Sequence, residues 1–154
     1  MKIGVFDSGI GGLSVANAVK KALPKDQIIF VNDQKNVPYG TKSPGQLLKL
    51  VVPILNDLVE QGCNAIVIAC NTVSTTIIDE LRKRISVPLI AMEPMIKPAA
   101  EQTKSKIITV FATPTTLASR RYSWLKANYA SGIKVLEPDC SDWALMIEDD
   151  QLDT

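Results

Sequence analysis

Short apolar runs alternate with longer amphipathic segments along this chain, and that alternation limits its fold more than any other feature. Runs rich in Ile, Val and Phe have the length of buried strands, at residues 2–7, 27–32, 64–70, 88–91, 106–111 and 133–136. The segments between them carry apolar residues at helical spacing, at residues 12–22, 45–61, 73–84, 115–128 and 141–149. Strands that alternate with helices of this length predict an α/β three-layer sandwich with a mainly parallel sheet.

Prolines mark two irregular places in this pattern. Pro53 lies inside the helical segment 45–61 and predicts a kink or a later helix start there. The stretch MEPMIKPAAE, residues 92–101, contains two prolines and separates the first four predicted strands from the rest. We expect a domain boundary in it, with a first lobe at residues 1–95 and a second lobe at residues 96–154.

The net charge, the apolar runs and the cysteine count limit the partners and the cellular location that we expect for the protein. Lys and Arg total 17 and Asp and Glu total 16, a net charge of +1, so nucleic acid is not expected as the main partner. The longest unbroken apolar run, Ala65 to Cys70, is too short to cross a membrane, and the N-terminus has no signal-peptide pattern. Three cysteines, an odd number, fit a reducing compartment, so we expect a cytoplasmic protein.

The sequence contains no histidine, which excludes several kinds of active site. Nucleophilic Ser-His and Cys-His pairs are impossible without it, and most catalytic zinc sites need it as a ligand. Chemistry in this chain must therefore use thiols, carboxylates, hydroxyls, amides or lysines. We expect no metal site.

Polar residues follow the predicted strands where each strand ends. Because ligands of parallel α/β sheets bind at the carboxyl ends of the strands, these residues are expected to meet at one edge. They offer a carboxylate, a thiol and a group of small hydroxyls and amides, with few aromatic rings to stack on a base. The candidate site residues are Asp7, Ser8, Tyr39, Gly40, Cys70, Asn71, Thr72, Thr113 and Thr116.

The turn Gly9-Ile10-Gly11-Gly12 after the first strand allows two interpretations. It resembles a dinucleotide-binding loop, and Asp33 follows the second strand where a ribose-binding acid would stand. However, Ser14 replaces the third glycine of that pattern, and a carboxylate at Asp7 opposes phosphate at the same helix start. The alternative is a tight turn in which glycine permits close packing.

Cys70 lies where an apolar strand meets the start of a predicted helix. A helix N-terminus stabilises a thiolate and lowers the pKa of the thiol, so Cys70 is a candidate base. The competing interpretation is a buried cysteine that only packs, which is the interpretation that we prefer for Cys63.

Four segments together resemble one enzyme family. FDSGIGGLSV, VPYG, AIVIACNTVS and ATPTTLASRRY occur in the order and at the spacing of the cofactor-independent glutamate racemases, in the aspartate/glutamate racemase superfamily. The resemblance implies an isomerase that interconverts L- and D-glutamate without a cofactor and supplies D-glutamate for peptidoglycan. Proton transfer in that family uses two cysteines on opposite faces of the substrate α-carbon.

The resemblance also implies a role for each candidate residue. Cys70 would be one of the two acid/base residues, and Asp7 and Ser8 would line the site, with Asp7 orienting the substrate ammonium or assisting Cys70. The glycine-rich turn would then serve close packing. The implied carboxylate contacts are Tyr39, Gly40, Asn71, Thr72, Thr113 and Thr116. Arg120 and Arg121 are expected to be solvated, and a homodimer is left open.

The chain departs from the family at the second cysteine. The family places it in a downstream Gly-Cys-Thr-His motif that this sequence lacks, and Cys140 stands in a different context, EPDCSDWALMIE. We therefore expect a truncated racemase with an incomplete second lobe, exposed apolar surface and self-association. The alternatives are a catalytically inactive lobe that binds an amino acid or carboxylate, an aspartate racemase-like isomerase and, last, a nucleotide-binding module.

Overall fold

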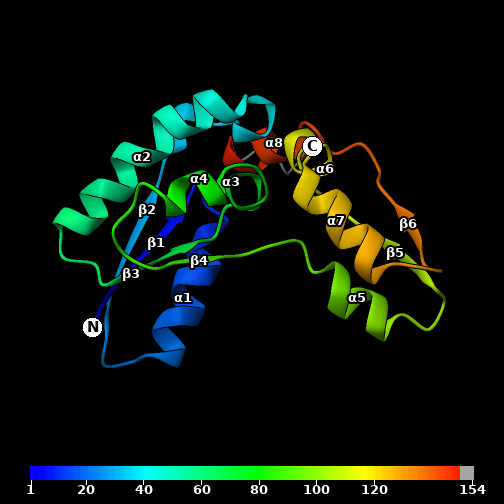
Figure 1. Ribbon diagram of the computed structural model, residues 1–154, viewed down its shortest axis with the longest axis horizontal. Helices are drawn as coiled ribbons and strands as arrows, with labels where there is room; N and C mark the ends of the chain where they lie inside the picture. The colour runs from blue at the N-terminus through cyan, green and yellow to red at the C-terminus, as the bar shows by residue number, and fades with distance from the viewer. Residues whose placement is uncertain (150–154) are drawn as a thin grey trace.

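The first half of the chain forms a four-stranded parallel sheet in a computed structural model that describes residues 1–149 (Figure 1). The strand order is β2-β1-β3-β4, with β1 pairing in parallel with both β2 and β3. The bounds are β1 Lys2–Asp7, β2 Gln27–Asn32, β3 Ala65–Ile68 and β4 Leu89–Ala91. The predicted α/β class with a mainly parallel sheet is confirmed.

Helices lie on both sides of this sheet, as Figure 1 shows for α1 and α2. The apolar stripe of α2 (Leu47, Val51, Leu55 and Leu58) is fully buried against the strands and forms the main hydrophobic core. The elements on these two sides and in the loop after β2 are α1 Gly12–Ala22, η1 Gln34–Asn36, η2 Tyr39–Thr41, α2 Pro44–Glu60, α3 Asn71–Thr76 and α4 Ile78–Arg82.

Two expectations for these helices need correction. The α2 helix does not start later because of Pro53. It begins at Pro44, where the Ser43 side chain accepts a hydrogen bond from the Gln46 backbone and the Gln46 side chain accepts one from the Ser43 backbone. The single helix predicted at 73–84 is instead broken at Ile77, whose φ of −132° is not helical. A run of β-branched residues before the break disfavours a continuous helix.

The second half forms a smaller parallel pair of strands with its own apolar cluster. Its elements are α5 Ile96–Gln102, β5 Ile107–Thr109, α6 Pro114–Leu117, α7 Arg120–Tyr129, β6 Lys134–Leu136 and α8 Trp143–Glu148. The predicted helix 115–128 is two helices, because Ser119 interrupts it and caps α7 by accepting a hydrogen bond from the Tyr122 backbone. The α5 helix lies in the segment expected to be a boundary. The division at residues 95 and 96 stays a prediction.

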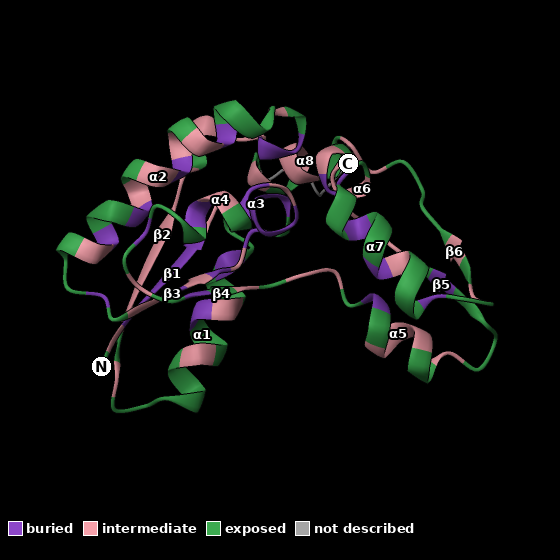
Figure 2. Ribbon diagram, viewed as in Figure 1, coloured by how far each residue is buried: buried purple, intermediate pink, exposed green. Residues whose placement is uncertain are grey.

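Burial differs between the two halves. Figure 2 shows the buried residues concentrated in β1, β3 and α3, whereas the second half of the chain has few buried residues. Ile107, Leu136, Phe111 and Trp143 are each between 41% and 57% exposed. No helix within residues 1–149 has the length and apolar character that crossing a membrane requires.

Candidate active site

The carboxyl edge of the four-stranded sheet brings the predicted thiol and the first-strand residues together. Cys70 ends the segment after β3 and directly precedes α3, while Ser8 directly follows β1. The Ser8 hydroxyl lies 3.3 Å from the Cys70 sulfur, within hydrogen-bonding range, and Cys70 is only 5% exposed. The predicted juxtaposition of Cys70 with Asp7 and Ser8 is therefore present.

The Asp7 carboxylate holds the glycine-rich turn. It accepts hydrogen bonds from the Ser8 backbone, at 2.9 Å, and from the Gly12 backbone, at 2.6 Å. A Cβ at Gly12 would overlap the Asp7 side chain and lie 2.9 Å from a ring carbon of Phe30. The protein's own carboxylate thus occupies the start of α1, and the glycine serves close packing, which argues against the dinucleotide-binding interpretation.

Burial is the largest cause of the pKa shifts of both acidic groups, Asp7 and Cys70. Burial raises the pKa of Asp7, although hydrogen bonds from Ser8 and Gly12 oppose the shift. Burial, and then the charge of Asp7, raise the pKa of the Cys70 thiol to about 11. The prediction that the helix start would lower this pKa is wrong, because burial outweighs the hydrogen bonds from Ser8 and the Val73 backbone.

Three threonine hydroxyls meet where the two halves of the chain touch. Thr72 Oγ1 lies 2.9 Å from Thr113 Oγ1 and 3.3 Å from Thr116 Oγ1, and the last two are 3.0 Å apart. All three were predicted from the sequence, and the fold brings them together across more than 40 residues of chain. Hydroxyl groups that both donate and accept suit a carboxylate site.

The Tyr39-Gly40 segment packs against the residues of this threonine cluster. The Thr115 hydroxyl donates to the Gly40 carbonyl oxygen at 2.6 Å, and a Cβ at Gly40 would lie 2.5 Å from Thr113 Cβ. The Tyr39 side chain is 2% exposed, and its hydroxyl donates to Asp33 Oδ2 at 2.6 Å. Burial and then the Asp33 contact raise the pKa of Tyr39. Asn71 is exposed at the start of α3, with no side-chain hydrogen bond to any residue in 1–149.

Glu148 is a site residue to which the sequence assigned no role. Its Oε1 accepts a hydrogen bond from the Ile10 backbone at 2.8 Å, and its negative charge helps to raise the pKa of Asp7. Its Oε2 is buried without a hydrogen-bond partner in the part of the chain that the structure describes. The two partners are 138 residues apart, and no local pattern in the sequence signals such a contact.

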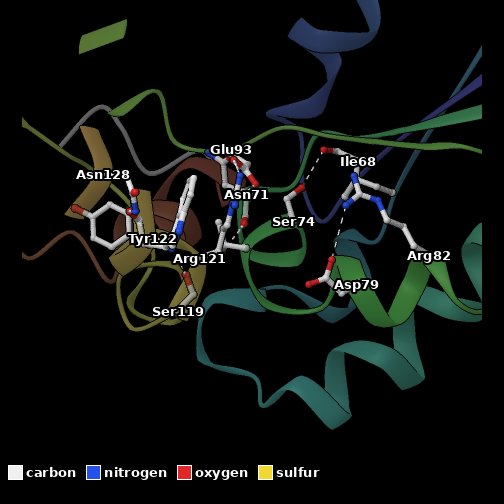
Figure 3. Close-up of polar contacts among 12 residues, drawn as sticks. Ile68, Asn71, Ser74, Asp79, Arg82, Glu93, Ser119, Arg121, Tyr122 and Asn128 are labelled. Atoms are coloured by element: carbon white, nitrogen blue, oxygen red, sulfur yellow. Dashed lines mark hydrogen bonds and ion pairs between the residues drawn. The ribbon is translucent and has the colours of Figure 1, made fainter. Parts of the chain in front are cut away.

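Cys140, Cys63 and Arg121 were also considered from the sequence, and each is buried or bonded within the protein. The Cys140 thiol donates to the Ala112 carbonyl oxygen at 3.3 Å, and Cys63 is buried. Arg121 is not simply solvated: its guanidinium forms a two-pronged ion pair with Glu93, at 2.6 and 2.9 Å, as Figure 3 shows. Across residues 1–149, no group of three or more metal-ligating side chains comes together.

One known protein family matches most of the chain. A family model described as Asp/Glu/Hydantoin racemase matches residues 8–148. The chain belongs to that family. Glutamate racemases from Ralstonia pickettii and Pseudomonas aeruginosa are each 42% identical to it, over 87% and 95% of the chain respectively. These alignments cover 48% and 56% of the two relatives, so the chain spans about half the length of the curated relatives that it matches.

Solved structures agree with the sequence comparison. Escherichia coli glutamate racemase in complex with L-glutamate and the activator UDP-MurNAc-Ala aligns with a TM-score of 0.88 and 32% identity, over 94% of this chain and 55% of that one. The Aquifex pyrophilus enzyme aligns with a TM-score of 0.81 and 34% identity, over 100% of this chain and 61% of that one. The resemblance read from the sequence motifs is confirmed.

Proposed function

We propose that this chain carries out the cysteine-based proton transfer of a glutamate racemase, in the cytoplasm and in the supply of D-glutamate for peptidoglycan. The observation that carries the proposal is the buried Cys70 thiol beside Ser8 and Asp7, with Thr72 of the threonine hydroxyl cluster two residues further along the chain. The glutamate racemases at about 40% identity support glutamate over aspartate as the substrate.

The first step is removal of the α-proton by the Cys70 sulfur. At neutral pH Cys70 is a thiol, because burial and then the charge of Asp7 raise its pKa to about 11. A substrate ammonium next to Asp7 would offset the carboxylate charge and favour the thiolate, and the thiol proton would be released to solvent as the substrate binds. The thiolate then takes the proton, so the Cα–H bond breaks and an S–H bond forms, and the electron pair stays on the substrate. Cys70 is only 5% exposed, so water has little access to its sulfur.

The substrate carboxylates would bind where the two halves meet. Thr72, Thr113 and Thr116 supply hydroxyl donors, and Asn71 supplies an amide with no side-chain partner within residues 1–149. The Tyr39-Gly40 segment would contribute backbone groups, because the Tyr39 hydroxyl is already bonded to Asp33. No cofactor is needed for this step.

Inversion requires a proton donor on the opposite face of the α-carbon. The sequence holds no Gly-Cys-Thr-His motif, and the Cys140 thiol is hydrogen-bonded to Ala112. A second candidate function, amino-acid binding without turnover, is favoured by the absence of that motif from the sequence.

Proton NMR of L- and D-glutamate in heavy water, with wild type and Cys70→Ala, tests the proposal. Cys63→Ala is the matched control, because it removes another buried thiol. We expect wild type and Cys63→Ala to exchange the α-proton of one or both enantiomers and Cys70→Ala to show no exchange. Exchange that survives in Cys70→Ala, or that occurs with aspartate instead of glutamate, contradicts the proposal. Calorimetric glutamate binding without exchange selects the binding-only function.

A further inference from the structure

Asp33 is closely bonded to the site but has no part in the chemistry proposed above. It directly follows β2, and its backbone N–H donates to the Asp7 carbonyl oxygen at 3.2 Å. Its carboxylate accepts hydrogen bonds from the Tyr39 hydroxyl, at 2.6 Å, and from the Asn36 amide, at 2.8 and 3.0 Å. No cation from residues 1–149 lies within ion-pair distance of it. Asp33 therefore connects the end of β1 to the Tyr39-Gly40 segment.

The buried position of Tyr39 restricts where the Gly40 backbone can lie. Tyr39 is 2% exposed, and its ring centroid lies 6.4 Å from that of Phe6 in β1. The next residue, Gly40, accepts the 2.6 Å hydrogen bond from Thr115 and packs so closely on Thr113 that a Cβ would lie 2.5 Å from Thr113 Cβ. A small displacement of Tyr39 would therefore separate Gly40 from the threonines of the second half.

We propose that Asp33 is a positioning residue, which fixes the Tyr39 hydroxyl and thereby places the Gly40 backbone against the threonine cluster. This inference rests on the proposed function, since that cluster is where a substrate carboxylate would bind. A hydrogen bond from a phenol to a carboxylate oxygen at 2.6 Å is short and directional, as positioning of the phenol requires. The Tyr39 hydroxyl then acts within the protein and does not bind the substrate.

A double-mutant cycle between Asp33 and Tyr39 tests the inference. The variants are Asp33→Ala, Tyr39→Phe and the double variant, with Asp33→Asn as the conservative replacement that keeps an acceptor oxygen. Asp57→Ala is the control, because Asp57 is an exposed acid on α2 whose carboxylate bonds only Gln61 among residues 1–149. The measurements are the dissociation constant for L-glutamate and amide hydrogen exchange of residues 39–42 against residues 65–68.

We expect Asp33→Ala and Tyr39→Phe each to weaken glutamate binding about tenfold, and the double variant to weaken it little further, because coupled residues are not additive. Exchange at residues 39–42 should accelerate in both variants while residues 65–68 stay protected. Asp33→Asn should restore most of the protection, and Asp57→Ala should change nothing. Additive losses, or unchanged exchange at 39–42 in Asp33→Ala, would overturn the inference.

The two measurements separate this inference from the proposed function. If wild type does not bind glutamate, the proposed function fails, but hydrogen exchange still decides whether Asp33 positions the segment. If Asp33→Ala does not fold, Tyr39→Phe removes the same hydrogen bond while keeping the buried ring. Faster exchange at 39–42 in that variant supports the inference, and wild-type exchange there overturns it.

Discussion

At the scale of single residues, the charge state of Cys70 depends on Asp7. The thiol has a pKa of about 11, above its ordinary value, first because of burial and then because of the Asp7 charge. Asp7→Asn removes the second cause, so the pKa of Cys70 should fall toward its ordinary value without reaching it. The rate of Cys70 alkylation by iodoacetamide, followed against pH by mass spectrometry, measures this shift. The same pH profile in both proteins would contradict the assignment, and alkylation of Cys140 provides the internal reference.

Gly12 and Gly45 form a matched pair for testing the packing role of the first turn. A Cβ at Gly12 would overlap Asp7 and lie 2.9 Å from Phe30, whereas a Cβ at Gly45 would meet nothing within 4 Å. Gly12→Ala should therefore lower the free energy of unfolding by about 1–3 kcal/mol, as overpacking does. Gly45→Ala, in the first turn of α2, should leave it unchanged or raise it by about 0.5–1 kcal/mol. Urea unfolding measures both, and equal effects would refute the packing argument.

At the scale of elements, Arg121 ties α7 to the segment that follows β4. The ion pair with Glu93 is two-pronged, its side chains are 42% and 27% exposed, and the guanidinium stacks on Trp124 at 4.5 Å. A double-mutant cycle with Arg121→Gln and Glu93→Gln should give a coupling free energy of about 0.5–1 kcal/mol. The exposed pair Lys97–Glu101, at 4.0 Å, should give a coupling near zero. A coupling at Arg121 no larger than at Lys97 would show that α7 is not held in this way.

The strands were predictable from the sequence because each is a short apolar run with polar residues after it. The helix breaks were not predictable, because each depends on a single residue and the apolar residues around it keep their helical spacing. Ile77 keeps the apolar spacing of 73–84 yet adopts a non-helical φ, and Ser119 ends one helix pattern by capping the next helix. The α5 helix was missed since Pro98 in its sequence reads as a breaker, although α5 includes it near its start.

At the scale of the whole molecule, the site combines contacts of two kinds. Asp7 ends β1, Ser8 follows β1 and Cys70 follows β3 of one parallel sheet, so the rule that strand ends converge placed them together. Glu148 reaches Ile10 across 138 residues, and the Tyr39 hydroxyl turns to Asp33, neither of which follows from spacing or periodicity. The unfavourable pKa of Cys70 was missed for the same reason, because burial is a property of the assembled fold.

The β5–β6 pair leaves one face of a parallel sheet uncovered. Ile108 and Val135 pack with residues of α5 and α7, while Ile107 and Leu136, which alternate with them along the strands, are 45% and 41% exposed. Parallel sheets are ordinarily covered on both faces, and the stacked, half-exposed Phe111 and Trp143 add further apolar surface on the same half of the chain. This surface should drive association of the chain with itself.

Sedimentation velocity over a range of protein concentrations tests that expectation. Wild type should form dimers or larger species as its concentration rises, and Ile107→Lys combined with Leu136→Lys should shift association to concentrations about tenfold higher, because the charges must be desolvated on contact. Leu23→Lys, at a 39% exposed position after α1, is the control and should associate like wild type. If wild type is monomeric at every concentration, the exposed face of the β5–β6 pair does not drive association. Equal effects of both substitutions would place the contact elsewhere on the molecule.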